Sequence, residues 1–261
     1  MVQLATALVT TAYLVGASVV AYTLFSRFAW RGRASWVLIG IGFMLLSLAL
    51  QVVVQAIPFL IIILTHIRDV LINASSATGV VLGFIRSNVY LVAIYMGLVA
   101  GISQEAFRYL AVRGRDFRST LYIGYGFALI DIAFAIMSVV LQSLIPTPMG
   151  INTQYMAVVP VIGLVGLVIQ PLVSFTFHPG ASMIMRSYQA ANKGFRGLLL
   201  MALAHAYMDS FVEYLNNALA LGLMSPSFII PISITYFVTV AAIPILIFIK
   251  GIRALVLASL V

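Results

Sequence analysis

The sequence predicts an all-α protein, a polytopic bundle of about seven transmembrane helices. Hydrophobic residues make up 63% of the 261-residue chain, and charged residues only 8%. A soluble domain carries about 25% charged residues, because it needs them to cover its surface. Most of the surface of this chain therefore has to face lipid, which excludes a soluble catalytic domain. The chain has no cysteine, which also excludes thiolate metal sites and cysteine nucleophiles.

Seven apolar segments are long enough to cross a bilayer, whose hydrocarbon core of about 30 Å requires roughly 20 helical residues. They run approximately over residues 3–26, 36–65, 87–112, 120–145, 156–184, 197–221 and 227–252. The first is expected to be a retained span rather than a removed signal peptide. Residues 66–86 are expected to form a short interfacial helix and residues 146–155 a loop. Residues 1–261 thus form one integral membrane domain, with the motif-bearing helices at about 87–221.

Basic side chains predict the orientation of this domain. Most of the 14 Lys and Arg residues follow the first, third, fifth and seventh segments. Because positive charge is retained on the cytoplasmic side, the N-terminus is predicted outside and the C-terminus in the cytoplasm of a multi-pass protein of the cell membrane. The net charge of +8 then reflects topology and contact with the lipid bilayer, and nucleic acid is not an expected partner.

A few ionisable residues lie inside the predicted spans, where each costs about 2.5–3.5 kcal/mol and needs a reason. They are Glu105, Arg108, Asp131, His178, His205, Asp209 and Glu213. With a rise of about 1.5 Å per residue, Glu105, His178 and His205 lie at a similar depth from the basic ends of three different helices. The sequence therefore predicts one polar layer shared by these helices.

Neighbours on the same helix support this layer. His205 and Asp209 share a face at i,i+4 spacing, so Asp209 is expected to hold His205 in one tautomer. Glu105 and Arg108 are spaced i,i+3, so the guanidinium is expected to orient the carboxylate.

Two further features bear on the layer. Asp131 is expected either to be functional or to pair with Arg108, Tyr122 or Tyr125. Pro179 removes a backbone donor from its helix, and a kinked helix of this kind is compatible with a polar cavity.

Three motifs in order resemble those of the YhfC family, which is classed among intramembrane peptidases. They are GISQEAFRYL at residues 101–110, FHPGAS at 177–182 and HAYMD at 205–209. The resemblance covers roughly residues 90–215. The wider group contains CAAX-processing endopeptidases, the PrsW proteases and the non-catalytic anterior-pharynx-defective scaffold of γ-secretase. The resemblance implies an intramembrane endopeptidase that hydrolyses a membrane-embedded or membrane-anchored peptide or protein.

The chain departs from the family pattern at one position. The family carries paired glutamates where this chain has Gln104-Glu105, and in the related CAAX proteases the first glutamate is the base. Gln104 cannot take a proton. Three interpretations stay open: Glu105 is the base, the protein is a natural pseudo-enzyme, or the glutamine is an engineered substitution.

Under the peptidase hypothesis, Glu105, or a glutamate at position 104, activates water. His178 and His205 stabilise the oxyanion or protonate the leaving amine, Asp209 orients His205, and Arg108 tunes the carboxylate. A mechanism without a cofactor is favoured over one with zinc, for which His178, His205 and Asp209 are the candidate ligands.

Two other classes of function remain. A non-catalytic membrane scaffold would use the same polar layer to hold helices together, with buried and fully paired Glu105, His178 and His205 and no path for water. A transporter or proton relay typically shows two related halves, whereas the chain shows no internal repeat.

Overall fold

The computed structural model describes residues 2–29, 34–144 and 159–258. Within these ranges the regular structure is helical. The helices are α1 (Val2–Ala29), α2 (Ala34–Thr65), α3 (Ile67–Ile72), α4 (Ser76–Ser87), α5 (Val89–Val112), α6 (Phe117–Leu144), α7 (Val159–Ala190), α8 (Gly194–Ala220) and α9 (Pro226–Ala258). All of these except α3 and α4 are long and apolar enough to cross a membrane. The predicted all-α bundle of seven spans is therefore confirmed for the described part of the chain.

The connections differ in detail from the prediction. Residues 66–86 were expected to hold one interfacial helix, but they form two short helices, α3 and α4, separated by a turn. The predicted loop at residues 146–155 lies outside the described residues.

Helix α7 continues well past its apolar segment, to Ala190. Polar side chains of its last turns find partners on other elements. The Arg186 guanidinium donates to the carbonyl of Arg115, and Gln189 Nε2 donates to the Tyr109 carbonyl oxygen at 2.9 Å. Hydropathy indicates only where a helix leaves the lipid. The polar contacts stabilise the turns of α7 that lie beyond that point.

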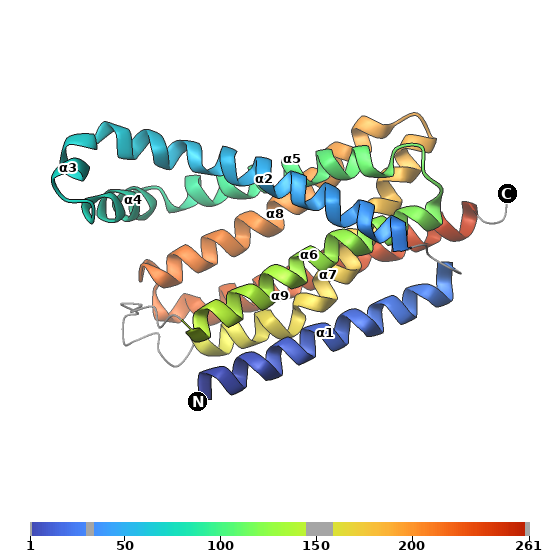
Figure 1. Ribbon diagram of the computed structural model, residues 1–261, viewed down its shortest axis with the longest axis horizontal. Coiled ribbons are helices and arrows are strands. Elements are labelled where there is room, and N and C mark those ends of the chain that lie inside the picture. The colour runs from blue at the N-terminus through green and yellow to red at the C-terminus, as the bar shows by residue number, and fades with distance from the viewer. Residues whose placement is uncertain (1, 30–33, 145–158, 259–261) are drawn as a thin grey trace.

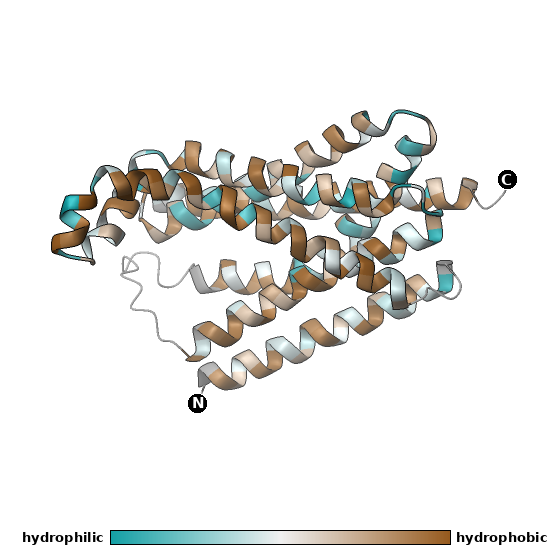
Figure 2. Ribbon diagram, turned by 45° about the horizontal axis from the view of Figure 1, so that its top comes forward, coloured by the Kyte–Doolittle hydropathy of each residue, from teal (hydrophilic) through white to brown (hydrophobic). Residues whose placement is uncertain are grey.

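The helices form two groups, α5 with α8 and α6 with α7 and α9, and α2 joins the two (Figure 1). The most extensive helix contact is between α5 and α8, followed by those of α7 with α9 and of α6 with α7. Helix α2 packs against both α5 and α6 and so connects the groups. Figure 2 shows hydrophobic residues along the length of the long helices, with hydrophilic residues at connections between helices and also on helix turns within the bundle. This is the distribution that a lipid environment requires.

The α5–α8 contact depends on glycine at two positions one turn apart. A Cβ atom at Gly101 would lie 2.6 Å from the Ala202 carbonyl oxygen. At Gly97 it would lie 2.6 Å from the Ala206 carbonyl oxygen and closer still to the backbone nitrogen of Ser210. Small residues allow helix backbones to approach in a membrane, and here they bring α5 and α8 close enough for their polar side chains to meet.

We expect Gly97→Ala to lower the stability of the protein in detergent by about 1–3 kcal/mol, because the added methyl group forces the two backbones apart. Gly42→Ala is the matched control, since Gly42 lies within α2 and a Cβ there has nothing within 4 Å. Thermal or denaturant-induced unfolding of both variants in the same detergent measures the difference. Equal stability of the two variants would contradict this packing.

The predicted basic residues gather at one end of the bundle, around the connections between α5 and α6 and between α7 and α8 (Figure 1). In the first of these connections, Asp116 caps α6: the Ser119 backbone N–H donates to Asp116 Oδ1 at 2.8 Å, as expected of an N-cap. Partial burial raises the pKa of Asp116, but the hydrogen bonds from Ser119 and from the backbone outweigh it, so the pKa lies below its usual value. The carboxylate therefore stays ionised beside the arginines.

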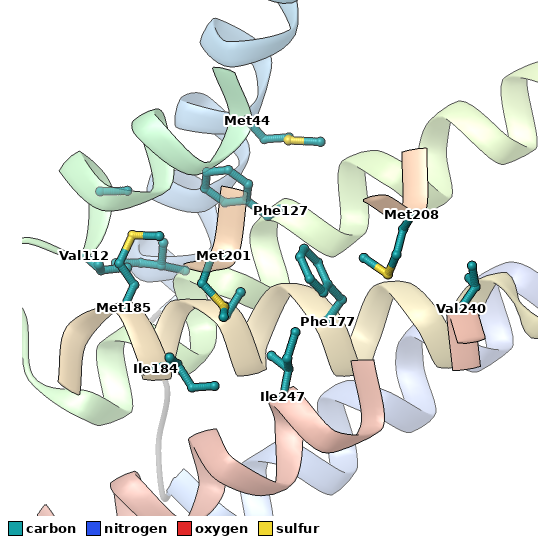
Figure 3. Close-up of a cluster of buried hydrophobic side chains, with 13 residues drawn as sticks. Met44, Val112, Phe127, Phe177, Ile184, Met185, Met201, Met208, Val240 and Ile247 are labelled. Atoms are coloured by element: carbon teal, nitrogen blue, oxygen red, sulfur yellow. The ribbon is translucent and has the colours of Figure 1, made fainter. Parts of the chain in front are cut away.

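A cluster of buried apolar side chains lies on the same helices as the polar layer. Val112, Met185 and Met201 come from α5, α7 and α8 and lie together in Figure 3, with the Phe177 ring between this group and Met208. The cluster packs the three helices against one another. It fixes the helices on which the polar residues are placed.

Candidate active site formed by α5, α6, α7 and α8

Arg108 of α5 is the centre of the polar layer, and its side chain is fully buried. Its Nε donates to Glu105 Oε2 at 2.8 Å. Its Nη1 donates to the His178 carbonyl oxygen at 2.8 Å and to Ser182 Oγ at 3.2 Å. Its guanidinium lies 4.4 Å from the centroid of the Phe127 ring. A buried arginine requires many acceptors, and this one joins α5 to the part of α7 around Pro179.

The tautomer of His178 follows from its neighbours. Arg108 Nη2 lies 2.5 Å from His178 Nδ1, and a guanidinium can only donate. Nδ1 must therefore be the unprotonated nitrogen, and the proton is on Nε2. Nε2 lies 2.5 Å from Asp131 Oδ2 of α6, so it donates to that carboxylate. His178 is thus a neutral imidazole held at both nitrogens.

His205 of α8 is held differently. Its Nδ1 lies 2.8 Å from Glu105 Oε1. Because Glu105 is ionised by its bond to Arg108, it accepts, and Nδ1 carries the proton. The other nitrogen, Nε2, is 3.6 Å from Asp209 Oδ2, too far for a hydrogen bond. One nitrogen of His205 is therefore fixed by protein, and the other is left for a ligand.

The structure brings the predicted layer together. Glu105 and His205 are hydrogen-bonded, and the rings of His178 and His205 are 5.8 Å apart between centroids. The expected Glu105–Arg108 pair is also present.

Two residues have other partners than those expected. Asp131 Oδ2 bonds His178 and accepts from Ser174 Oγ at 3.3 Å, and neither was among its expected partners. The tautomer of His205 is set by Glu105 rather than by Asp209. These differences arise because the sequence fixes depth along a helix but not the direction in which each face points.

A cavity of about 400 Å³ lies inside the bundle against this layer, and we call it the polar cavity. Its wall includes Gln104, Asp131, Ser174, His178, His205 and Asp209. The side chains of Asp131 and Asp209 are 27% and 34% exposed, whereas Glu105 and Arg108 are fully buried and are not among the lining residues. Glu105 thus acts on the cavity only through His205.

A second cavity, of about 570 Å³, continues from the first, and we call it the apolar cavity. The two share lining residues on α6, α7, α8 and α9, among them Ser138, Gln170, Val212 and Tyr236. From these shared residues it extends between α7 and α8 past Gly163, Leu167 and Leu219, towards the ends of the helices opposite the basic residues. The two cavities together therefore form an elongated space that leads from the helix ends opposite the basic residues to the polar layer.

Gln104 lies at the wall of the polar cavity and is 5% exposed. Its Nε2 donates to Gln51 Oε1 of α2 at 3.0 Å. Its Oε1 is buried without a hydrogen-bond partner. Gln104 thus presents an unused acceptor at the wall of the polar cavity.

The candidate zinc ligands do not fit a metal ion. Both ring nitrogens of His178 are bonded to protein groups, one of them to a guanidinium that can only donate. In the described ranges, no group of three or more His, Asp or Glu side chains is arranged to hold a metal.

The sequence analysis missed some members of the site. Ser174 and Ser182 contact Asp131 and Arg108, and Gln51 and Gln55 support Gln104 through α2. A signal for them existed: Ser174, His178 and Ser182 follow one another at i,i+4 spacing on one face of α7.

No family model, curated protein or solved structure matches this chain. The resemblance to intramembrane peptidases therefore stays a prediction, carried by the three motifs.

Proposed function

We propose that this protein is an intramembrane endopeptidase that hydrolyses a peptide bond of a membrane-embedded or membrane-anchored substrate in the polar cavity. The observation that carries the proposal is the Glu105–His205 pair, whose free Nε2 is on a residue of the cavity wall. A carboxylate that fixes one imidazole nitrogen leaves the other as a general base, as in hydrolases with an acid–histidine pair.

The roles follow from these contacts. His205 Nε2 takes a proton from water, whose oxygen forms the new bond to the carbonyl carbon. The carbon–nitrogen bond then breaks, and His205 returns the proton to the leaving nitrogen. Glu105 positions His205. In this proposal His205 is the base, the role that the sequence analysis gave to Glu105. Asp209, beside Nε2, helps to hold the water.

We assign to His178 the stabilisation of the oxyanion that develops on the substrate. Its Nε2–H bonds Asp131 at the cavity wall, and it exchanges this bond for one to the substrate oxygen as negative charge forms there. Arg108 fixes the tautomer that makes this donation possible, through its contact with Nδ1.

The scaffold alternative has one observation in its favour. Glu105, Arg108 and His178 are buried and bonded to one another across α5 and α7, which is how a structural polar layer is built. The polar cavity argues against it, since a scaffold has no use for a space lined by an imidazole nitrogen and two carboxylates.

We expect the purified protein in detergent to cleave some members of a library of membrane-anchored peptides, and Asp209→Asn to lower kcat/KM about tenfold. Loss of one oriented hydrogen bond to the reacting water corresponds to about 1–1.5 kcal/mol. A chelator should leave the rate unchanged, because both nitrogens of His178 are engaged by protein groups.

Glu213→Gln is the matched control, because Glu213 is also a carboxylate on α8 but accepts from Asn217 within that helix. It should cleave like the natural protein. If the folded natural protein cleaves no peptide, the scaffold function takes the place of the peptidase.

A further inference from the structure

The N–H donors of Arg108, His178 and His205 are already in use. Arg108 donates to Glu105, to Ser182 and to two atoms of His178. His178 Nε2–H donates to Asp131, and His205 Nδ1–H to Glu105. In the absence of a ligand, each of these polar N–H groups has its acceptor.

The wall also carries free acceptors. His205 Nε2 holds a lone pair, the Asp209 carboxylate has only the 3.6 Å contact to this nitrogen, and Gln104 Oε1 is buried without a partner. A buried acceptor that is left unsatisfied costs free energy. A ligand that donates hydrogen bonds would remove this cost.

The assignment of the free Gln104 atom as the oxygen follows from a chain of amides. Gln55 Nε2 lies 2.9 Å from the Met96 carbonyl oxygen, which can only accept, so the nitrogen of Gln55 must point there. Its Oε1 then faces Gln51 Nε2 at 3.4 Å, and Gln51 Oε1 faces Gln104 Nε2 at 3.0 Å. One backbone carbonyl thus sets the direction of all three amides and leaves Gln104 with an oxygen to offer.

The charges point the same way. The layer contains the carboxylates of Glu105, Asp131 and Asp209, and Arg108 is the guanidinium among them. Since His178 is neutral, a single guanidinium balances only Glu105, to which it is bonded. Asp131 and Asp209 both line the cavity, and uncompensated carboxylates within a membrane favour a cation.

We infer that the polar cavity binds a primary ammonium group, and hence that the substrate is a peptide presenting its N-terminal amine or a lysine side chain there. Gln104 and Asp209 accept from the ammonium, and Asp131 becomes a third acceptor when His178 turns to the substrate oxygen. Calling this ligand a substrate rests on the proposed function, but the binding of an ammonium group does not. The apolar cavity receives the hydrophobic part of the same ligand, since the two spaces share their walls.

Calorimetric titration in nanodiscs whose lipid, phosphatidylcholine, carries no primary amine tests this inference with three probes of equal chain length. Octylammonium carries charge and N–H donors, octyltrimethylammonium carries charge alone, and N-octylacetamide carries an N–H alone. After subtraction of binding to empty nanodiscs, octylammonium should bind about tenfold more tightly than either of the others. Equal binding of the trimethyl probe or of the amide would overturn the inference.

Variants assign the binding to the wall. Gln104→Leu and Asp209→Asn should each weaken octylammonium binding about tenfold. Gln189→Leu is the matched control, because Gln189 also has a buried Oε1 without a partner but is not among the lining residues of either cavity. An effect of Gln189→Leu equal to that of Gln104→Leu would contradict the assignment.

Two short peptides with an octyl tail distinguish the sources of the ammonium: one has a free N-terminus and no lysine, and the other is acetylated with a single lysine. If neither peptide binds, the inference is contradicted. Because binding is measured without cleavage, a protein that binds octylammonium and cleaves nothing supports this inference and contradicts the peptidase. A protein that cleaves peptides but does not discriminate among the probes contradicts the inference alone.

Discussion

Replacement of His205 by glutamine should lower kcat/KM for peptide cleavage about 10²–10⁴-fold, which is the usual contribution of a general base. His205 is the residue whose free nitrogen faces the polar cavity while the other is fixed by Glu105. Glutamine retains a hydrogen-bonding side chain towards Glu105 but cannot take the proton of water. Initial rates on a cleaved peptide, with thermal unfolding as a check on the fold, measure the effect.

Glu105 and His205 should behave as one unit. Glu105→Gln removes the charge that fixes the Nδ1–H tautomer, so its rate should fall by a comparable factor. The double variant should then be little slower than either single one, because residues that act together are not additive. Glu213→Gln is the control, since this carboxylate on α8 bonds Asn217 instead of a histidine. Additive losses in the double variant would show that Glu105 acts independently of His205.

Much of the fold could be predicted because bilayer thickness sets helix length. The sequence also predicted the polar layer, since the rise of a helix converts the positions of Glu105, His178 and His205 into depths. What it could not give was the rotation of each helix about its axis. In a soluble protein, polar residues mark the exposed face, but in lipid both the outer and the packed faces are apolar.

The misassigned partners follow from this lack of rotational information. Asp131 is at the right depth for several groups, and only the packing of α6 against α7 selects His178. For the same reason, the i,i+4 spacing of His205 and Asp209 suggested a hydrogen bond between them. The close approach of α5 and α8 at Gly97 and Gly101 instead places His205 within hydrogen-bond distance of Glu105. The sequence indicated a polar cavity only as compatible with Pro179, and the shape and lining of the cavities could not be predicted, because they are the space left between side chains of several helices.

Replacement of Arg108 by methionine should destabilise the protein by about 3–5 kcal/mol, the largest effect expected for a single substitution here. Methionine has a similar length, but it leaves the fully buried Glu105 carboxylate without its cation and removes the bonds to His178 and Ser182. Denaturant-induced unfolding in mixed micelles measures the loss. Arg108→Lys should recover only part of it, since an ammonium group cannot serve the several acceptors of a guanidinium.

The double variant Glu105→Gln/Arg108→Met distinguishes the cost of an unpaired charge from the loss of packing. If the charge dominates, removing the carboxylate as well should restore a large part of the stability, because no ion is then left buried alone. The restored protein should nevertheless be inactive, since His205 has lost the partner that fixes its tautomer. A double variant as unstable as Arg108→Met would show that the contacts of Arg108 with α7, rather than its charge, hold the layer together. Stability and catalysis would then depend on different partners of the same arginine.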